Sequence, residues 1–592
     1  MDFNCGTINE SHIGKDVTLY GWCRYIRDHG GKLFIDIADM HGSTQLVFEK
    51  EAKEKADKLG KEYVICASGT VKKREDDTVD SSNPTGRVEL HVKSLEIISE
   101  AAVPPFEIIE EKEKFLANEE LRLKYRYLDL RRKQMVSNIV LRDKISKAAR
   151  KYFWENGFME LETPSLVKDN YETGSRTLIV PSRIDKGKFY ALAQSPQIYK
   201  QILMASGFDK YFQIAKCFRD EDPREDRQPE HTQIDLEVAF KDEKYIQKLV
   251  EELFERIFKE ALGKKLKTPF MHMRYSDAIR TYGSDKPDMR FDSKIVDITK
   301  EMEGGEYNII KRVIESKGHV KAICFDAKFD GDKGRIDKNY MLKMIELAKL
   351  FGLRGLTWLY VKDNAIHSEP ESIAQSLRKC EADMRKKMGA KNGDIIIAGA
   401  DLSEKILLDA LGRLRKTIGE RIGEYSSEHA FLWIDEFPLF EANEVTGKLV
   451  PAHNPFTSPT QSTMKFLDES PEKVRGRQYD LVLNGNELGS GAIRINDPKL
   501  QRKIMKMFGM DDETIDKSFG FFIEALSYGM PVEGGMGLGL DRIVALLGGS
   551  GNIRDYILFP KNKKFESSVD MSPTQINAKR LKNDYGLEFK EV

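Results

Sequence analysis

The sequence has few of the features that mark secreted, membrane or disulfide-linked proteins. Its six cysteines are scattered and form no C-x-x-C pair, which favours reduced thiols over a disulfide framework or a zinc site. No apolar run reaches the length of a membrane span, and the acidic start MDFNCGTINE lacks the basic and apolar parts of a signal peptide. These absences predict a soluble cytoplasmic protein with no membrane partner.

Net charge is also nearly absent, because 95 Lys and Arg residues face 96 Asp and Glu residues, for a formal charge of -1. No global field therefore attracts nucleic acid, although a local basic patch still could. The 592 residues exceed what one hydrophobic core supports, so the chain is expected to form several domains.

The first hundred residues do contain a β-barrel pattern. Five apolar or alternating runs lie between turn residues, with a charged helical stretch, Glu51–Leu59, between the third and fourth runs. This order predicts a five-stranded OB-fold over residues 1–103, a fold that often binds single-stranded nucleic acid. The side chains expected to face unpaired bases and phosphates are Phe34, Gln45, Arg24, Arg27 and His29. Alternatively, Phe34 belongs to the core and Arg27 is a solvated charge.

The remainder divides by changes in pattern. The segment LRLKYRYLDLRRK at 121–133 predicts a basic, aromatic helix that either lies along RNA or, more simply, packs against its neighbours. Alternating strands and helices over 291–420 predict an inserted α/β domain. The expected domains are the barrel at 1–103, a hinge at 104–135, and one core whose two halves, 136–290 and 421–560, surround the insert at 291–420. A polar tail follows at 561–592.

The most informative stretch, CFRDEDPREDRQPEHTQIDLEVAF, runs from Cys217 to Phe240. Apolar residues in its second half alternate with Asp235, Glu237 and Ala239, which predicts two strands joined by a charged, proline-containing loop. An Arg-Asp-Glu triplet against a strand end, followed by an aspartate on the strand face, indicates a floor that positions a phosphate-bearing ligand.

Two carboxylates flank a second turn signal. Asp480 and Glu487 lie on either side of Asn484-Gly485, a dipeptide that favours a hairpin and would bring the two strands side by side. Paired carboxylates suit magnesium, which takes few protein ligands and leaves positions for phosphate oxygens. Solvated strand charges are the alternative, and the residues alone favour that alternative.

Three stretches together, GFMELETP (157–164), CFRDED with its loop (217–228) and GMGLGLDR (535–542), resemble motifs one, two and three of the class II aminoacyl-tRNA synthetases. Four further segments, QSPQIYKQ, RQPEHTQID, AHNPFTSP and NGNELGSGAIRI, make nearly the whole chain similar to the bacterial-type aspartyl-tRNA synthetases. One such motif would be weak evidence, whereas several in this order are hard to obtain by chance.

The resemblance implies an α+β multidomain fold, in which an antiparallel-sheet catalytic core carries the OB-fold and the insert, and a homodimer formed through motif one. It also implies a two-step reaction. L-aspartate attacks the α-phosphate of ATP, with Mg²⁺ as cofactor, to give aspartyl-adenylate and pyrophosphate, and the terminal adenosine of tRNA then takes the aspartyl group. No side-chain nucleophile is needed, because the substrate carboxylate already is one.

The resemblance assigns catalytic roles to Arg219, at the α-phosphate, and Arg542, at the γ-phosphate, where planar guanidinium groups follow charge spreading over phosphate oxygens. An ion pair with Asp220 or Glu221 is the alternative for Arg219. His231 stands where the family usually has a stacking phenylalanine, so its charging near pH 6.5 is expected to weaken ATP binding in acid. The ATP contacts implied are Arg219, Asp220, Glu221, Gln228, His231, Glu487, Gly539, Leu540, Asp541 and Arg542.

Substrate choice follows from charge. Lys200 and Arg494 match family positions that grip the side-chain carboxylate of aspartate, and asparagine would leave this cation pair unneutralised. Asn454 stands where the family commonly has a second histidine. The other aspartate contacts implied are Glu172, Ser195, Gln197, Arg219, Asp235 and His453.

Two positions concern tRNA choice. A histidine where His29 stands resembles non-discriminating enzymes, which charge both tRNA-Asp and tRNA-Asn, whereas discriminating relatives tend to have leucine. Asp77 matches neither class at the second marker position. The sequence therefore predicts a non-discriminating aspartate–tRNA ligase, with a discriminating one as the alternative. An RNA-binding paralogue without catalysis, asparaginyl or lysyl transfer, and an ammonia-using amide synthetase are disfavoured.

Overall fold

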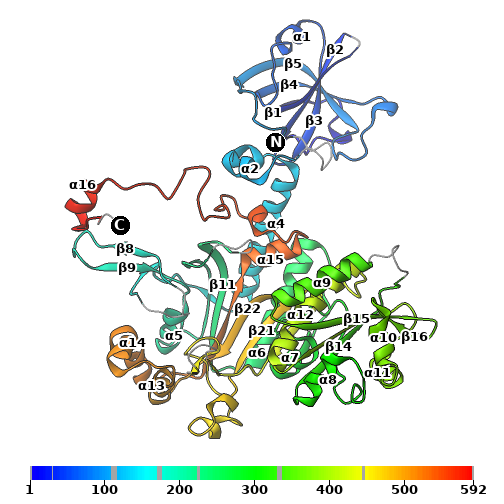
Figure 1. The fold of residues 1–592 in the computed structure, drawn as a ribbon. Helices are drawn as coiled ribbons and strands as arrows, with labels where there is room; N and C mark the ends of the chain where they lie inside the picture. Colours follow the sequence, from blue (N-terminus) through cyan, green and yellow to red (C-terminus); the bar gives the residue numbers. More distant parts are fainter. Residues whose placement is uncertain are drawn as a thin grey trace. The chain divides into compact units, whose positions relative to one another are not determined.

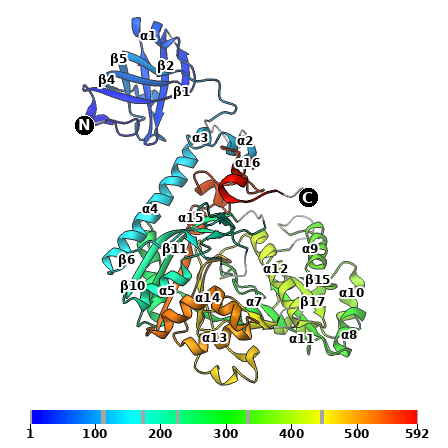
Figure 2. The ribbon, with the colours of Figure 1, turned by 90° about the vertical axis from the view of Figure 1, so that its left-hand side faces the viewer.

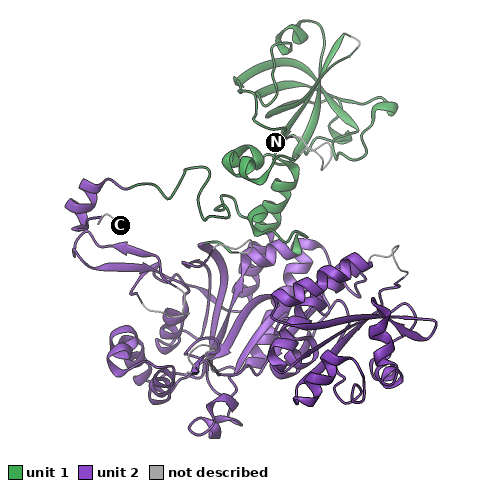
Figure 3. Cartoon of the chain, in the orientation of Figure 1, with its two compact units in different colours: residues 1–143, 223–228, 547–575 green, residues 144–222, 229–546, 576–592 purple. Residues whose placement is uncertain are grey.

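The computed structural model describes residues 3–29, 31–108, 116–169, 176–222, 227–329, 336–442, 447 and 449–589. The chain divides into two compact units (Figure 3). Unit 1 contains residues 1–143, 223–228 and 547–575, and unit 2 contains residues 144–222, 229–546 and 576–592. Each unit is therefore assembled from segments that are far apart in the sequence.

Unit 1 begins with a closed barrel of five strands in the order β1-β2-β3-β5-β4 (Figure 1). Alternate residues of β2, Leu33, Ile35 and Ile37, lie in its core, because successive side chains of a strand point to opposite faces. The predicted five-stranded barrel is confirmed. Its elements are β1 (Asp16–His29), β2 (Lys32–Asp39), β3 (Gly42–Phe48), α1 (Glu51–Ala56), β4 (Val64–Lys73) and β5 (Val88–Ser99).

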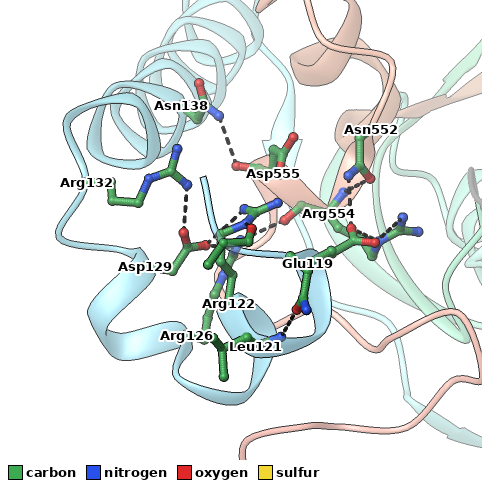
Figure 4. A network of polar contacts seen from close by, with 12 residues as sticks. Glu119, Leu121, Arg122, Arg126, Asp129, Arg132, Asn138, Asn552, Arg554 and Asp555 are labelled. Atoms are coloured by element: carbon green, nitrogen blue, oxygen red, sulfur yellow. Dashed lines mark hydrogen bonds and ion pairs between the residues drawn. The ribbon is translucent and has the colours of Figure 1, made fainter. Parts of the chain in front are cut away.

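The basic segment after the barrel forms α2 (Glu119–Lys124), α3 (Arg126–Asp129) and the start of α4 (Lys133–Glu155). Its arginines converge on the buried Asp129, whose two carboxylate oxygens each accept a 2.7 Å hydrogen bond, one from Arg126 and one from Arg132 (Figure 4).

The Arg126 guanidinium also donates to three backbone carbonyl oxygens, those of Arg554, Ile557 and Leu558, at 2.7–2.9 Å. Glu119, the first residue of α2, accepts from Arg554 Nε at 2.7 Å, so α2 and α3 both contact residues 554–558. Of the two expected roles, packing therefore fits these arginines.

Unit 2 is built on an eight-stranded sheet in the order β12-β18-β21-β22-β23-β11-β10-β6. Every pairing in it is antiparallel except the two outermost, β12 with β18 and β10 with β6. The predicted strand pair around the charged loop is confirmed as β10 and β11. The strands are β12 (Met271–Arg274), β18 (Phe431–Asp435), β21 (Gln478–Leu483), β22 (Asn486–Ile493), β23 (Glu533–Gly539), β11 (Glu230–Ala239), β10 (Lys210–Phe218) and β6 (Met159–Glu160).

Two helices mark the two faces of this sheet. Lys200 of α5 (Gln197–Ala205) contacts Asp235 of β11, whereas Ile246 of α6 (Glu243–Ile257) lies against Gly534 of β23. A Cβ built on Gly535, the next residue of β23, meets the Glu237 carboxylate instead. Since neighbouring residues of a strand point to opposite faces, α5 and α6 cover opposite sides of the sheet.

Residues 295–401 carry a separate five-stranded sheet in the order β13-β14-β17-β15-β16. Its pairings are all antiparallel, and alternate residues feed two hydrophobic cores, as Ile395 and Ile397 pack on one face and Ile396 and Ala398 on the other. The elements are β13 (Ile295–Asp297), α8 (Asn308–Glu315), β14 (His319–Phe325), α9 (Lys338–Leu350), β15 (Gly355–Lys362), β16 (Ala365–His367), α10 (Glu371–Leu377), α11 (Glu381–Met388), β17 (Ile395–Asp401) and α12 (Glu404–Ile422).

The remaining elements of unit 2 are short strands and peripheral helices. Helices α13 and α14 lie side by side (Figure 2). Among the described residues, no helix is long and apolar enough to span a membrane. These elements are β7 (Leu166–Val167), β8 (Ile179–Pro181), β9 (Phe189–Leu192), α7 (Tyr275–Tyr282), β19 (Phe440–Ala442), β20 (Leu449–Pro451), α13 (Pro498–Met507), α14 (Asp512–Ser527), α15 (Leu540–Leu547) and α16 (Ala578–Arg580).

Candidate active site

The floor of the candidate site is the sheet face covered by α5. Asp235 and Glu237 of β11 pair in register with Gly537 and Gly535 of β23. A Cβ on Gly535 would lie 2.0 Å from Glu237 Oε2, and one on Gly537 would lie 1.6 Å from Gln233 Nε2. The glycines of the GMGLGLDR segment therefore leave room for polar side chains of β11 to lie across the neighbouring strand.

Buried charges of both signs meet on this floor. Lys200 Nζ lies 2.9 Å from Asp235 Oδ1 and 2.9 Å from Glu237 Oε2. On the other side of Glu237, Arg494 Nε lies 2.9 Å from Oε1, and Nη2 lies 3.3 Å from Oε2. All four side chains are buried. Although burial raises it, Arg494 and Lys200 hold the pKa of Glu237 below its usual range, so this carboxylate is charged.

Several polar atoms of this cluster are left open by the described residues. Asp235 Oδ2 and Gln197 Nε2 are buried and have no hydrogen-bond partner there. Arg494 Nη1 likewise makes no hydrogen bond to a described residue, although Nε and Nη2 of the same guanidinium do. Buried polar atoms are almost always paired, so the open Asp235 acceptor and Gln197 donor, beside the Arg494 guanidinium, fit a ligand that brings both a donor and an anionic acceptor.

A second group of cations lies next to this cluster. Arg219 follows β10 and its Nη1 lies 3.8 Å from Glu221 Oε1, a loose ion pair, while its Nε is buried without a partner among the described residues. Arg542, in the first turn of α15, donates from Nη1 to the backbone oxygen of Glu487 at 2.7 Å. The charged groups that act on His231 include both arginines, so Arg219 and Arg542 lie within electrostatic reach of the same ring.

His231 does not titrate where the sequence predicts. Burial, and then the adjacent Arg219, lower the pKa of His231 to about 4. The ring is therefore neutral throughout the physiological range, and the expected loss of ATP binding near pH 6.5 is wrong as an effect of this residue. A neutral imidazole can stack on a base without repelling the neighbouring arginines.

The predicted carboxylate hairpin is present. Strands β21 and β22 are joined at Asn484 and Gly485, with φ of 51° and 74°, and Val482 pairs with Glu487 while Asp480 pairs with Ser490. Burial and the nearby Glu487 raise the pKa of Asp480 well above its usual range. Two carboxylates that oppose each other's ionisation, one of them buried, form a donor set that fits a hard divalent cation.

The loop that bears His453 lies beside β22, where His453 Nε2 and Ser490 Oγ are 3.1 Å apart. Glu487, Arg494 and Arg219 are the charged groups that act on this histidine, so it lies within electrostatic reach of both cation groups. The Asn454 side chain is engaged within its own loop, because its Oδ1 accepts from the backbone nitrogen of Phe456 at 3.0 Å.

Other predicted contacts have local partners. The Ser195 hydroxyl accepts from Gln197 N at 3.3 Å at the start of α5. Asp541 accepts from Thr232 N at 2.8 Å and so ties α15 to β11, next to Gly539 and Leu540. Asp220 forms a bridge with Arg176, and Gln228, in unit 1, exchanges two hydrogen bonds with the backbone of Lys561. Glu172 lies outside the described residues.

On the barrel, three of the predicted tRNA-facing side chains, Phe34, Arg27 and Gln45, share one outer face. Phe34 lies opposite Arg27 in the β1–β2 register and is only half buried, so the alternative that it belongs to the core is wrong. Arg27 Nη2 donates to Gln45 Oε1 at 3.2 Å, which places the aromatic and the amide side by side. His29 and Asp77 are both exposed.

One predicted barrel contact is wrong. Arg24 Nη1 pairs with the buried Glu62, and the same carboxylate accepts from Arg131 Nη1 at 2.8 Å. Arg24 also donates to the backbone oxygen of Arg131. It therefore joins the barrel to the following helices inside unit 1 and does not face a phosphate.

Two charged residues of the floor were missed by the sequence analysis as site residues, Glu237 and Glu533. The signal was available, because both lie at the same alternation as Asp235 once β11 and β23 are placed in register. A third acidic group, Asp297 with His319 and Glu404, gathers ligand atoms in the described part of the insert. Lys321 Nζ lies 2.9 Å and 2.8 Å from its two carboxylates, so an ammonium group already neutralises it.

Comparisons with known proteins agree with this geometry. Residues 118–563 match the family model described as tRNA synthetases class II (D, K and N), and residues 17–98 match the OB-fold nucleic acid binding domain. This chain belongs to the class II tRNA synthetases. The synthetase family thus accounts for the antiparallel core sheet, and the OB-fold model for the barrel.

Full-length relatives of this synthetase chain are aspartate–tRNA ligases. The chain is 42% identical to one from Clostridium kluyveri, over 99% of this chain and 98% of the relative. It is 43% identical to an aspartate–tRNA(Asp/Asn) ligase from Treponema denticola, with the same coverage. The fold resembles that of Pyrococcus horikoshii asparaginyl-tRNA synthetase with a TM-score of 0.60 at 20% identity, over 95% of this chain and 98% of that one.

Proposed function

We propose that this chain is an aspartate–tRNA ligase, which activates L-aspartate with ATP and transfers it to the 3′ end of tRNA-Asp. The observation that carries the proposal is the cation pair Lys200 and Arg494 on a fully buried floor, with Arg494 Nη1 open toward a ligand. A side-chain carboxylate satisfies that donor and the positive charge behind it, whereas an amide brings no charge. Asp235 Oδ2 is the matching acceptor for the substrate ammonium.

The first step joins two anions, so the residues must gather and orient them. The α-carboxylate of aspartate attacks the α-phosphorus of ATP, and the bond to the bridging oxygen breaks to release pyrophosphate. In this proposal Arg219 stabilises charge on the α-phosphate, and Arg542 holds the leaving pyrophosphate. Gln197 and Asp235 fix the amino acid, and His231 stacks on adenine as a neutral ring.

Asp480 and Glu487 are the residues that would hold Mg²⁺. The ion, when bound with ATP, supplies charge neutralisation on the phosphate oxygens. Glu487→Gln removes half of the carboxylate pair, and we expect the Mg²⁺ concentration for half-maximal ATP–pyrophosphate exchange to rise by about tenfold or more. An unchanged Mg²⁺ titration would remove Glu487 from the metal site, and Glu469→Gln, an exposed glutamate in the same unit, serves as the control.

The partner RNA is read by the barrel face that carries Phe34, Arg27 and Gln45, where one base stacks and others meet polar edges. His29, at the exposed end of β1, favours an enzyme that charges tRNA-Asn as well as tRNA-Asp. The enzyme works in the cytoplasm, and it functions as a homodimer formed through motif one, residues 157–164.

Paired charging of tRNA-Asp and tRNA-Asn transcripts tests the RNA part of the proposal. The wild type is expected to charge both at comparable rates, and His29→Leu is expected to slow tRNA-Asn by about tenfold while tRNA-Asp and ATP–pyrophosphate exchange change little. His41→Leu, at another exposed histidine in the β2–β3 turn, is the matched control. Wild-type charging restricted to tRNA-Asp would make the enzyme a discriminating one.

A further inference from the structure

Glu533 is a carboxylic acid on the site floor to which none of the chemistry above gives a role. It opens β23 and pairs in register with Ala239 of β11, and its backbone oxygen accepts from Arg494 N at 2.9 Å. Side chains alternate between the two faces along β23, so the Glu533 side chain points to the same face as a Cβ at position 535 or 537. That face carries Glu237 and Asp235. Its side chain is fully buried.

Neither carboxylate oxygen of Glu533 has a hydrogen-bond partner among the described residues. Glu237, on the same face, has both oxygens paired with Lys200 and Arg494. A buried ionised carboxylate without a donor is strongly unfavourable, whereas a protonated one is merely a polar group that lacks an acceptor. Geometry alone therefore favours the acid form of Glu533.

The groups that face Glu533 come from three elements. Glu237 on β11 repels a second negative charge, while Arg494 after β22 and Lys200 on α5 attract one, and both cations are already engaged by carboxylates. The nearby phenols Tyr211 and Tyr479 are buried and their pKa values are raised, so they stay neutral. Burial first, and then Glu237, raise the pKa of Glu533 well above its usual range.

We propose that Glu533 determines specificity by holding a proton, so that the four ion-paired residues of the floor, Lys200, Arg494, Asp235 and Glu237, stay without an excess negative charge beside them. Lys200 and Arg494 balance Asp235 and Glu237, so the substrate's side-chain carboxylate is the first excess negative charge that the pocket receives. Loss of the Glu533 proton adds a competing charge that repels aspartate but not asparagine. This inference rests on the proposed function, because it concerns the choice between those two amino acids.

The pH dependence of amino acid selection tests it. In the full-length wild type, ATP–pyrophosphate exchange is measured with aspartate and with asparagine from neutral to alkaline pH. The KM for aspartate is expected to rise by about tenfold as Glu533 ionises, with no matching rise in the KM for asparagine or ATP. The variant Glu533→Gln separates the effect of Glu533 from other alkaline effects: its profile is expected to lose the part due to Glu533.

Two outcomes overturn the proposal. One is a ratio of kcat/KM for aspartate to kcat/KM for asparagine that does not change with pH in the wild type. The other is a pH profile of the KM for aspartate that is the same in Glu533→Gln, the wild type and the exposed control Glu469→Gln. If Glu533→Gln does not fold, Glu533→Met supplies a neutral side chain of similar length for the same comparison. Absence of aspartate-dependent exchange at every pH would instead contradict the proposed function, so the two failures are distinguishable.

Discussion

The network around Asp129 and the pocket around Glu237 both bury arginines against a carboxylate, but they differ in which polar atoms remain open. In the network, the guanidinium nitrogens Nε, Nη1 and Nη2 of Arg126 all donate, and both Asp129 oxygens accept (Figure 4). In the pocket, Arg494 keeps Nη1 open, and an oxygen of Asp235 has no partner among the described residues.

This difference separates a structural role from a binding role. Arg126 and Asp129 pair all their side-chain polar atoms within their own chain, so they stabilise one arrangement and offer nothing to a ligand. A pocket that leaves donors and acceptors unpaired keeps a desolvation penalty that a suitable ligand removes on binding. Variants of the two clusters are therefore expected to separate activity from stability.

The largest effect is expected for Arg219→Ala. Arg219 is partly exposed and forms only a loose ion pair, so its loss should leave the free energy of unfolding nearly unchanged. Its loss should lower ATP–pyrophosphate exchange by about 10³-fold or more, because charge on the α-phosphate is no longer stabilised. Arg183→Ala, an exposed arginine in the same unit, is the control. Unchanged exchange would exclude Arg219 from the reaction.

Arg494→Leu should affect both amino acid selectivity and stability, since Arg494 is ion-paired with Glu237 and also keeps Nη1 unpaired. We expect the preference for aspartate over asparagine to fall by about 10³-fold, and the protein to lose about 3–5 kcal/mol of stability because Glu237 loses its guanidinium partner. The ratio of kcat/KM values and a urea unfolding curve measure the two effects. Arg494→Lys keeps the charge but not the fork, so it should recover part of the selectivity. A preserved preference in Arg494→Leu would refute the assigned role.

Arg126→Met should affect stability alone. It removes the Arg126 donor from one oxygen of the buried Asp129 and from three carbonyl oxygens, which is expected to cost about 3–5 kcal/mol. Urea unfolding followed by circular dichroism measures this cost, and the exposed Arg183→Ala should show none. The KM for aspartate of the folded variant should stay at the wild-type value. A change in amino acid selectivity would mean that the network and the pocket are not separate in function.

His231→Phe should have the smallest effect. Because burial and Arg219 lower the pKa of His231 to about 4, the ring is neutral above that pH and stacks much as phenylalanine does. The KM for ATP should differ from wild type by less than about threefold, with parallel profiles between about pH 5.5 and 8. If the KM for ATP of the wild type rose as the pH fell through about 6.5, and that of the variant did not, His231 would become charged in the working pH range.

Sequence patterns predicted the elements whose signals are local. The barrel strands, the β10–β11 pair and the Asn484-Gly485 hairpin follow from alternation and turn chemistry in continuous stretches. Glu237 shares the alternation of Asp235 on one strand, but Glu533 could not be placed in the site without the register between β11 and β23, which joins segments about 300 residues apart. Arg24 failed for a related reason, because its partner Glu62 comes from a distant turn.

Aspartate-dependent ATP–pyrophosphate exchange without tRNA, measured side by side with asparagine, tests the buried cation pair most directly. Rapid exchange with aspartate and a rate lower by several orders of magnitude with asparagine is the expected result. Equal exchange with both amino acids, or tRNA binding without any exchange, would contradict the role of Lys200 and Arg494 as the groups that select an acidic substrate.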